Sequence, residues 1–209
     1  MKRLLFRSKL GIVEAILEQR KTMFRRVVGN KLLMDAMLYS GCGSMLKNEY
    51  LLSHSMYKVG DVVAIAQSYK SIEEEIEDYK SGYLPSWIKG ECYSAFLKAK
   101  EKEDLTKQRG YDNAMYINTE LMPHKIRITF VDVEHLNEIC VNDAKDEGME
   151  LCAYHLYDGT RKIGYEACGI DDVFTTPIDA FAHFIDKVIG RHTWERNPLV
   201  YVYSFELID

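Results

Sequence analysis

One apolar run constrains the fold more than any other feature of the sequence. The residues VVAIA at 62–66 follow the turn signal KVGD at 58–61 and include no polar side chain. A short continuous run of this kind is typical of a buried strand at the centre of a sheet or in a barrel. The run LVYVYSF at 199–205 predicts a closing strand. The chain therefore needs a sheet with a hydrophobic core around it.

The other periodicities predict an α+β order of elements. Helical spacing of apolar residues indicates helices, alternation with period two indicates strands, and Gly and Pro mark their limits. The predicted strands lie at 4–6, 22–28 and 125–133, and the predicted helices at 10–19, around 73–78, at 141–148 and at 177–190. Between them we predict an irregular connection at 31–56, a lid at 81–116, an N-cap at Asn142 or Asp143 and a hairpin turned at Asp158-Gly159. Because regular βαβ alternation is missing, we expect a small β-barrel with peripheral helices rather than a doubly wound sheet.

Composition excludes several classes of protein. The 209 residues are 47% hydrophobic and include 14 Tyr and 8 Phe, enough apolar area for a folded core. No window holds the roughly 18 uninterrupted apolar residues of a membrane-spanning helix, and charges break the apolar start before a signal-peptide core could form. Five cysteines at scattered spacings argue against a disulfide framework. We expect a cytoplasmic protein with reduced thiols and no membrane partner.

The charge distribution is asymmetric. The formal net charge is −5, which disfavours a protein that coats duplex nucleic acid. Residues 1–31 carry nine basic side chains against two acidic ones, a local charge of +7 that leaves −12 for the rest. A basic face on an acidic body suits a small anion better than a long polyanion. Ordinary solvated charges are the alternative interpretation.

Motif searches exclude three common enzyme classes and predict no cofactor. The sequence has no P-loop, no Rossmann glycine pattern and no nucleophile elbow, so kinase, dehydrogenase and serine-hydrolase functions are excluded. Cys152 and His155 lie three residues apart with Cys140 nearby, but no second paired spacing completes a zinc site. We therefore predict no metal site.

The basic residues at 20–26 form the first candidate site. Lys21 is a compact cation, and Arg25 and Arg26 present planar donors that suit phosphate or carboxylate. In a strand, residues 22, 24 and 26 share one face and residues 21, 23 and 25 the other. All of them can line one cleft only if Lys21 lies in the preceding loop.

Three further residues complete the candidate site. Glu147 ends a predicted helix, where its charge opposes the helix dipole, and a cation such as Lys21 would explain that placement. The pair could work as acid and base or anchor an amide, and a solvated surface glutamate is the alternative. Trp194 and Asn197 precede the last strand, where a tryptophan can stack on a base or, as we favour, pack in the core.

An ordered series of motifs carries a family resemblance. The series comprises RKTMFRR at 20–26, YKVGD at 57–61, MP at 122–123, VDVEHLNEI at 131–139, DA at 143–144, EG at 147–148 and WERNP at 194–198. In that order it resembles the ASCH domain of the PUA-like superfamily, in the form often found in phage and prophage proteins. The resemblance spans nearly all of 1–209 as one domain, with insertions at 31–56, 68–120 and 150–176.

The resemblance implies a PUA-like barrel with a cleft beside the first helix that binds RNA or modified nucleosides. Family members with a known activity are amidohydrolases that remove the acetyl group of N4-acetylcytidine with a lysine, a threonine and a glutamate. The lysine corresponds to Lys21 and the glutamate to Glu147, whereas the threonine corresponds to Phe24. Phenylalanine cannot attack a carbonyl, so Thr22 would have to replace the nucleophile, roughly 6.6 Å away on the same face.

Two functions follow as expectations. The first is binding of RNA or a modified nucleoside, through the ligand-binding residues Lys21, Arg25, Arg26, Glu147, Trp194 and Asn197. The second is hydrolysis of an acylated nucleoside, with Lys21, Glu147 and Thr22 as the catalytic residues. Phe24 favours binding, and a phage-encoded interaction protein with a degenerate site is a third, weaker possibility.

Overall fold

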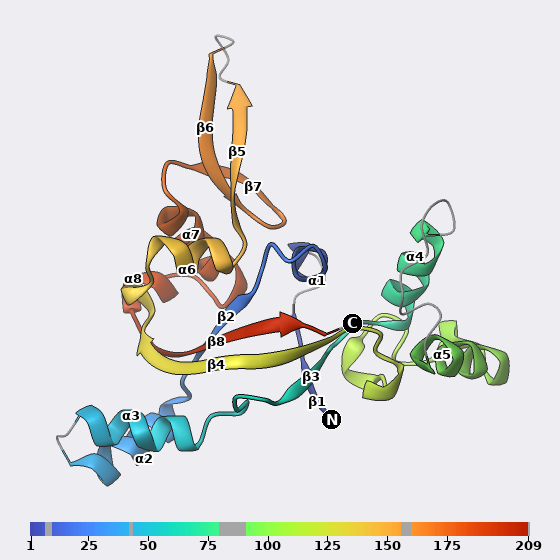
Figure 1. The fold of residues 1–209 in the computed structure, drawn as a ribbon, viewed down its shortest axis with the longest axis horizontal. Helices are drawn as coiled ribbons and strands as arrows, with labels where there is room; N and C mark the ends of the chain where they lie inside the picture. Colours follow the sequence, from blue (N-terminus) through green and yellow to red (C-terminus); the bar gives the residue numbers. More distant parts are fainter. Residues whose placement is uncertain (7–9, 42–43, 80–90, 156–159, 209) are drawn as a thin grey trace. The chain divides into compact units, whose positions relative to one another are not determined.

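The fold is described from a computed structural model, which defines residues 1–6, 10–41, 44–79, 91–155 and 160–208 (Figure 1). It has the α+β order that the sequence predicts, with helices between the strands of two separate sheets. Contacts divide the chain into two units. The first comprises Met1–Ser8, Asp61–Arg127 and Glu206–Asp209, and the second comprises Lys9–Gly60 and Ile128–Phe205. All of the candidate site residues belong to the second unit.

The larger sheet has five strands and is open. Its order is β1-β3-β4-β8-β2, made of β1 Lys2–Leu4, β3 Val62–Ile65, β4 Lys125–His135, β8 Leu199–Leu207 and β2 Met23–Val27. A closed barrel requires the two edge strands to pair with each other. In the part of the chain that the structure describes, β1 pairs with β3 and β2 with β8, and no pairing joins the two edges. The expected barrel is therefore wrong, and β1, at three residues, is a short edge.

Both apolar runs form the buried strands that the sequence predicts. In β3, Val63, Ala64 and Ile65 are fully buried. In β8, every residue from Leu199 to Tyr203 is buried, because this strand lies between β4 and β2. The half-buried strand at 125–133 is confirmed as the start of β4.

The first unit has a hydrophobic core that joins β3 to two helices, α4 Tyr69–Tyr79 and α5 Glu91–Lys102. The predicted acidic helix is α4. The core cluster comprises Ala64, Ala66, Tyr69, Ile72, Ile76, Phe96, Leu105, Ile117 and Met122. Residues 80–90 of the expected lid lie outside the described residues, and the rest of that segment folds into α5 and short 3₁₀ turns. Because Phe96 and Leu105 are buried in this core, the described part of the expected lid is a structural part of the unit.

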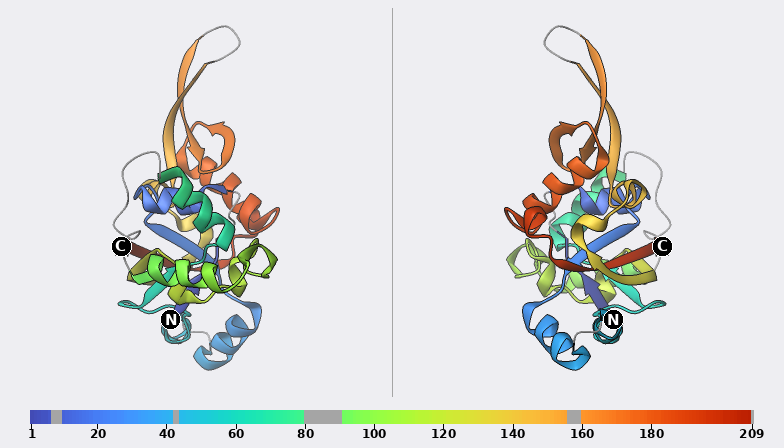
Figure 2. Two further views of the ribbon diagram at one scale, coloured as in Figure 1. Left: turned by 90° about the vertical axis from the view of Figure 1, so that its right-hand side faces the viewer. Right: turned by 90° about the vertical axis from the view of Figure 1, so that its left-hand side faces the viewer.

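The second unit places several helices around β2 and β8, together with a three-stranded sheet. Its helices are α1 Ile12–Leu17, α2 Asn30–Ser40, α3 Ser44–Ser53, α6 Val141–Asp146, α7 Pro177–Val188 and α8 Thr193–Arg196, and its small sheet is β5 Met149–His155, β6 Arg161–Ala167 and β7 Ile170–Phe174. The β5–β6 hairpin projects from the helices of its unit in both views of Figure 2. Its predicted turn, Asp158-Gly159, lies outside the described residues. None of the helices in the described part of the chain is long and apolar enough to cross a membrane.

The expected irregular connection at 31–56 is wrong, because this stretch contains α2 and α3, which pack against each other. Leu, Met, Ala and Lys are good helix formers, so local propensity favours the helices. The prediction failed because the apolar residues of α2 occupy more than one side of the helix. No single apolar stripe then signals the helical period.

Candidate functional site

The turn between α1 and β2 positions Lys21. The main-chain N–H groups of Arg20 and Lys21 both donate to the carbonyl of Ala15, at 2.8 and 3.0 Å. Gln19 supports this tight turn with a φ of 59°, in the left-handed region. Lys21 therefore lies in the loop before β2. The sequence analysis predicted that Lys21 must lie there if it is to share a site with residues of the strand.

Lys21 and Glu147 form a buried ion pair. The Lys21 Nζ lies 2.5 Å from Glu147 Oε2 and donates to the Glu147 main-chain oxygen at 2.7 Å. Each side chain is only 2% exposed, and the ring of Phe184 lies 5.6 Å from the ammonium. The expectation that a cation faces Glu147 at its helix end is therefore met by the geometry. Burial of both charges makes the pair strongly interdependent, because either charge alone would be uncompensated.

Helix α6 presents Glu147 at its C-terminal end. The Glu147 N–H donates to the main-chain carbonyl of Asp143 at 2.8 Å, which closes the last turn of the helix. Gly148 follows with a φ of 95°, a conformation that favours glycine. At the other end, the Cys140 thiol accepts from the Asp143 N–H at 3.4 Å. Cys140 is therefore the N-cap, and the predicted cap at Asn142 or Asp143 is wrong by two or three residues.

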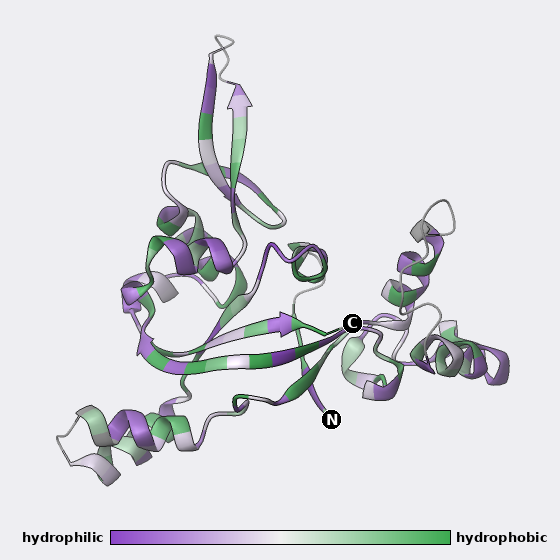
Figure 3. Cartoon of the chain, viewed as in Figure 1, coloured by the Kyte–Doolittle hydropathy of each residue, from purple (hydrophilic) through white to green (hydrophobic). Residues whose placement is uncertain are grey.

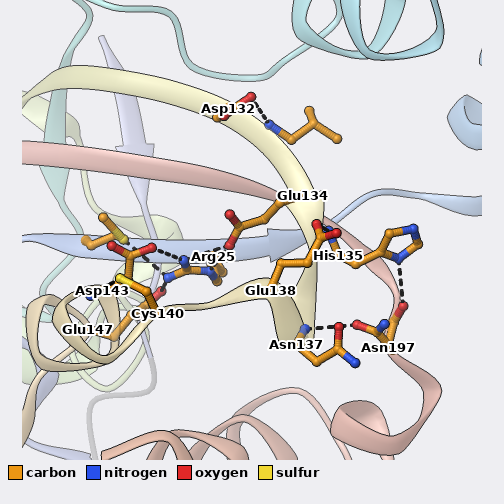
Figure 4. A network of polar contacts seen from close by, with 12 residues as sticks. Arg25, Asp132, Glu134, His135, Asn137, Glu138, Cys140, Asp143, Glu147 and Asn197 are labelled. Carbon is orange, nitrogen blue, oxygen red and sulfur yellow. Dashed lines mark hydrogen bonds and ion pairs between the residues drawn. The ribbon is translucent and has the colours of Figure 1, made fainter. Parts of the chain in front are cut away.

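Arg25 joins the same cluster from β2 (Figure 4). Its guanidinium lies 3.2 Å from Glu147 Oε1, 2.7 Å from Glu134 Oε1 and 2.9 Å from Asp143 Oδ2. Burial opposes the charged form of Arg25, but the negative charge of Glu147 and the bonds to Glu134 and Asp143 outweigh burial and raise its pKa. The cluster therefore holds two cations among three carboxylates, and each guanidinium nitrogen already has a partner.

Thr22 connects this cluster to the sheet through its main chain. Its N–H donates to the main-chain carbonyl of Asp146 at 2.8 Å, and its carbonyl accepts from the main-chain N–H of Phe205 at 2.9 Å. Burial, followed by the charges of Asp143 and Glu147, raises the pKa of Asp146. Thr22 thus fixes the end of α6 against β8, which is a structural role independent of its hydroxyl.

The opposite face of β2 is aromatic. Phe24 stacks on Tyr203 with ring centroids 4.8 Å apart and lies 6.1 Å from Tyr57 and 5.8 Å from Phe205. The guanidinium of Arg26 lies over the Tyr57 ring at 5.7 Å. Burial raises the pKa values of Tyr57 and Tyr203. The structure therefore brings Lys21, Arg25 and Glu147 together and places Phe24 and Arg26 on the other side.

Trp194 and Asn197 also lie outside the ion cluster. Trp194 is half-buried and meets Phe181 edge to face at 6.2 Å, which agrees with the packing role that we favoured. The Asn197 side chain accepts from the Asn137 N–H at 2.9 Å, and its carbonyl lies 3.1 Å from His135 Nδ1. Figure 4 shows Asn197 against the turn that follows β4. Asn197 holds this turn, and its αL conformation, with a φ of 44°, is one that Asn tolerates.

A pocket of about 330 Å³ lies beside α1. Its polar lining comprises Glu14, Arg20, Glu150, Glu166, Cys168 and Asp171. Arg20 pairs with Glu150 and, at 2.5 Å, with Glu18. Burial raises the pKa of the Cys168 thiol, although the charges of Lys21 and Arg20 oppose the shift. The pocket therefore presents mainly carboxylate acceptors and a protonated thiol at neutral pH.

Gly148 stands between the pocket and the ion pair. A Cβ on Gly148 would lie 3.5 Å from the Lys21 Cβ and 3.8 Å from the Cys168 Sγ. Lys21 and Glu147 do not line the pocket themselves. They fix the segment that backs its thiol.

Sequence reasoning missed Asp143 and Glu134, the further partners of Arg25, and the carboxylates of the pocket. Asp143 lies four residues before the candidate Glu147 on a helix, a spacing that puts both on one face and could have indicated their common partner. The carboxylates of the pocket come from α1, β5, β6 and the start of β7, so no sequence spacing brings them together.

Comparison with known proteins adds no assignment. No family model matches the chain, and neither a curated protein nor a solved structure matches it. Among the described residues, no group of three or more His, Cys, Asp or Glu side chains is placed to hold a metal ion. The site must therefore be interpreted from the chemistry of its own residues.

Proposed function

We propose that the protein binds a nucleoside in the pocket beside α1. The observation that carries the proposal is the pocket itself, about 330 Å³ in volume and lined by polar groups from several elements. Pockets of about 300–1,000 Å³ with a few convergent polar groups are typical of small-molecule sites. The resemblance to ASCH domains supports the same position, because it implies a nucleoside-binding cleft beside the first helix.

The lining favours a neutral nucleoside over an RNA strand. Glu14, Glu166 and Asp171 supply carboxylate oxygens, which accept hydrogen bonds from base amino groups and ribose hydroxyls. The same carboxylates repel phosphate, and the one arginine of the lining is already paired with Glu150. Arg25, a predicted phosphate ligand, is likewise occupied by carboxylates.

The geometry supports binding better than amide hydrolysis. The Lys21 ammonium is held by the Glu147 carboxylate and carbonyl, and both side chains are buried away from the pocket lining. Phe24, at the position of the family's threonine, lies in the aromatic cluster on the other face of β2. The ion pair therefore lies behind the pocket wall, with Gly148 between Lys21 and Cys168.

Alkylation of Cys168 tests the proposal. N4-acetylcytidine or cytidine should slow modification of Cys168 by iodoacetamide in a saturable way, because the thiol lines the pocket. The exposed thiol of Cys140 is the internal control and should react at an unchanged rate. Mass spectrometry of the modified peptides provides the rates.

A carboxylate variant sharpens this test. Glu14→Gln should weaken nucleoside binding by about tenfold or more, since a hydrogen bond to a charged group is worth roughly 1.5–3 kcal/mol. Glu49→Gln makes the same change on an exposed residue of α3 and should have no effect. Binding of an RNA oligonucleotide without any nucleoside binding would overturn the proposal. Release of cytidine from N4-acetylcytidine would instead identify an amidohydrolase.

A further inference from the structure

Two carboxylates face each other across the strands that line the pocket. Glu150 on β5 and Glu166 on β6 are directly opposite in the antiparallel register, and both line the pocket. Like charges in this arrangement are destabilising. Figure 3 shows hydrophilic residues, in purple, among hydrophobic residues, in green, along β6. The hairpin therefore carries a repulsive pair on the face that it presents to the pocket.

The two carboxylates differ in their partners. Glu150 is paired with the Arg20 guanidinium, whereas no cation in the described part of the chain forms an ion pair with Glu166. Burial, followed by the charge of Glu166 and a hydrogen bond to its carboxylate, raises the pKa of the Cys152 thiol. A thiol is a weak donor, and a carboxylate has about four acceptor sites, so Glu166 keeps acceptor capacity for a ligand.

The sheet fixes the position of Glu166. Its strand, β6, lies between β5 and β7 and is paired with both. The side chain is only partly exposed, whereas Glu14 on α1 and Asp171 on β7 are exposed. A recognition group works best on a rigid element that holds it in one geometry. Of the carboxylates in the lining, Glu166 is therefore the one best placed to select a ligand.

The chemistry of the lining indicates which base fits. Its ionised carboxylates only accept hydrogen bonds, and its donors are the Arg20 guanidinium and the Cys168 thiol. Guanine presents N1–H and the N2 amino group side by side, so one carboxylate can accept from both, and its single carbonyl, O6, can accept from a donor of the lining. Adenine and cytosine present one amino group each on that edge. Uracil presents two carbonyls, which carboxylates would repel.

We propose that Glu166 determines the specificity of the pocket and that the ligand is a guanine nucleoside. This inference rests on the proposed nucleoside pocket and adds its substrate class. The Glu166 carboxylate accepts from N1–H and from the N2 amino group of the base. These N–H groups supply the positive partial charge that offsets the repulsion between Glu150 and Glu166.

Calorimetric titration with guanosine and inosine tests the recognition. Inosine differs from guanosine only by the absence of the N2 amino group. Guanosine should bind about tenfold or more tightly than inosine, because a hydrogen bond to a charged group is lost with the amino group. Cytidine and N4-acetylcytidine should also bind more weakly than guanosine.

Glu166→Gln separates recognition from a structural role. The variant should weaken guanosine binding by about tenfold or more and bring the affinities of guanosine and inosine close together. It should also raise the melting temperature by about 1–3 °C, because Glu150 no longer faces a like charge. Glu49→Gln, on exposed α3, is the matched control and should change neither property. A lower melting temperature with equal weakening of both nucleosides would overturn the proposal, because Glu166 would then hold the fold and not the base.

The titrations also distinguish this inference from the proposed function on which it rests. Equal affinities for guanosine and inosine, or tighter binding of cytidine, would overturn the guanine assignment and leave the nucleoside pocket standing. If no nucleoside binds and none protects Cys168 from alkylation, both the assignment and the pocket proposal are wrong.

Discussion

The two faces of β2 are stabilised by different interactions. On one face, Arg25 and the preceding Lys21 meet three carboxylates at hydrogen-bonding distances. On the other face, Phe24 packs against three aromatic rings at centroid distances of 4.8 to 6.1 Å. The interactions on the first face are stabilising only with the right charges and hydrogen-bond directions. Those on the second face stabilise through buried apolar area and ring contacts.

This difference separates the residues that the resemblance to ASCH domains would make catalytic. Lys21 and Glu147 lie on the first face, which we call the ionic face, whereas Phe24 lies on the second, which we call the aromatic face. Stability alone does not require the ionic face, since well-packed apolar residues often replace a buried ion pair without loss. It also brings Lys21 beside Gly148, which lies next to the pocket thiol of Cys168.

The largest expected effect comes from removing one charge of the ionic face. Glu147→Leu should lower the free energy of unfolding by about 3–5 kcal/mol, because Lys21 is left buried without a counter-charge. Urea unfolding at neutral pH measures the loss. Lys21→Met combined with Glu147→Leu should recover most of it. A double variant as unstable as Glu147→Leu alone would show that shape, and not charge pairing, holds the two residues together.

A hydroxyl on the aromatic face should have a smaller effect on stability and none on catalysis. Phe24→Thr should cost about 3 kcal/mol, since it removes a ring that is 4% exposed and stacked on Tyr203. The variant should not release cytidine from N4-acetylcytidine, because the new hydroxyl faces the rings and not Lys21. Val27→Thr, on a half-exposed position of β2, is the control and should cost far less. Deacetylation by Phe24→Thr would contradict the assignment of faces.

Sequence patterns predicted the elements whose local pattern is unambiguous. The helix at 177–190 has one apolar stripe, the run at 62–66 is apolar throughout, and the strand at 22–28 lies between the turn signals of its neighbours, so all three were predicted correctly. Helix α2 was missed since it is apolar on two sides. The prediction of a closed barrel was wrong because closure depends on whether the two edge strands pair with each other. The period-two patterns of β1 and β2 do not specify which strand each one pairs with.

The candidate site was predicted only in part, because local patterns indicate which residues share a face but not which elements the fold brings together. Strand alternation and the helix dipole anticipated that Lys21 could meet Glu147, and the structure places them together. Arg26 was included although alternation assigned it to the opposite face. The pocket could not be predicted, because Glu14, Glu166 and Asp171 are brought together by tertiary structure alone.

The smallest expected effect concerns Asp146, at the edge of the ionic face. Burial and the charges of Asp143 and Glu147 raise its pKa above the ordinary value of 3.8, so the folded state binds its proton more tightly than the unfolded state. Ionised Asp146 therefore opposes folding above its folded pKa, and the cost vanishes below about pH 3.8, where both states are protonated. Asp146→Asn should stabilise the protein at pH 7 by no more than about 0.5 kcal/mol, because only part of the side chain is shielded from solvent and most of it is exposed, so solvent screens its charge.

Thermal unfolding of Asp146→Asn at pH 7 and pH 3 measures this difference. The gain should be present at pH 7 and absent at pH 3, while the Thr22 N–H bond to the carbonyl of residue 146 stays the same in both proteins. Lys145→Gln changes a charge on the neighbouring exposed residue and should not produce that pH dependence. A loss of stability at pH 7 would instead mean that the negative charge of Asp146 supports Lys21 and Arg25, and the ionic face would then include a fourth carboxylate.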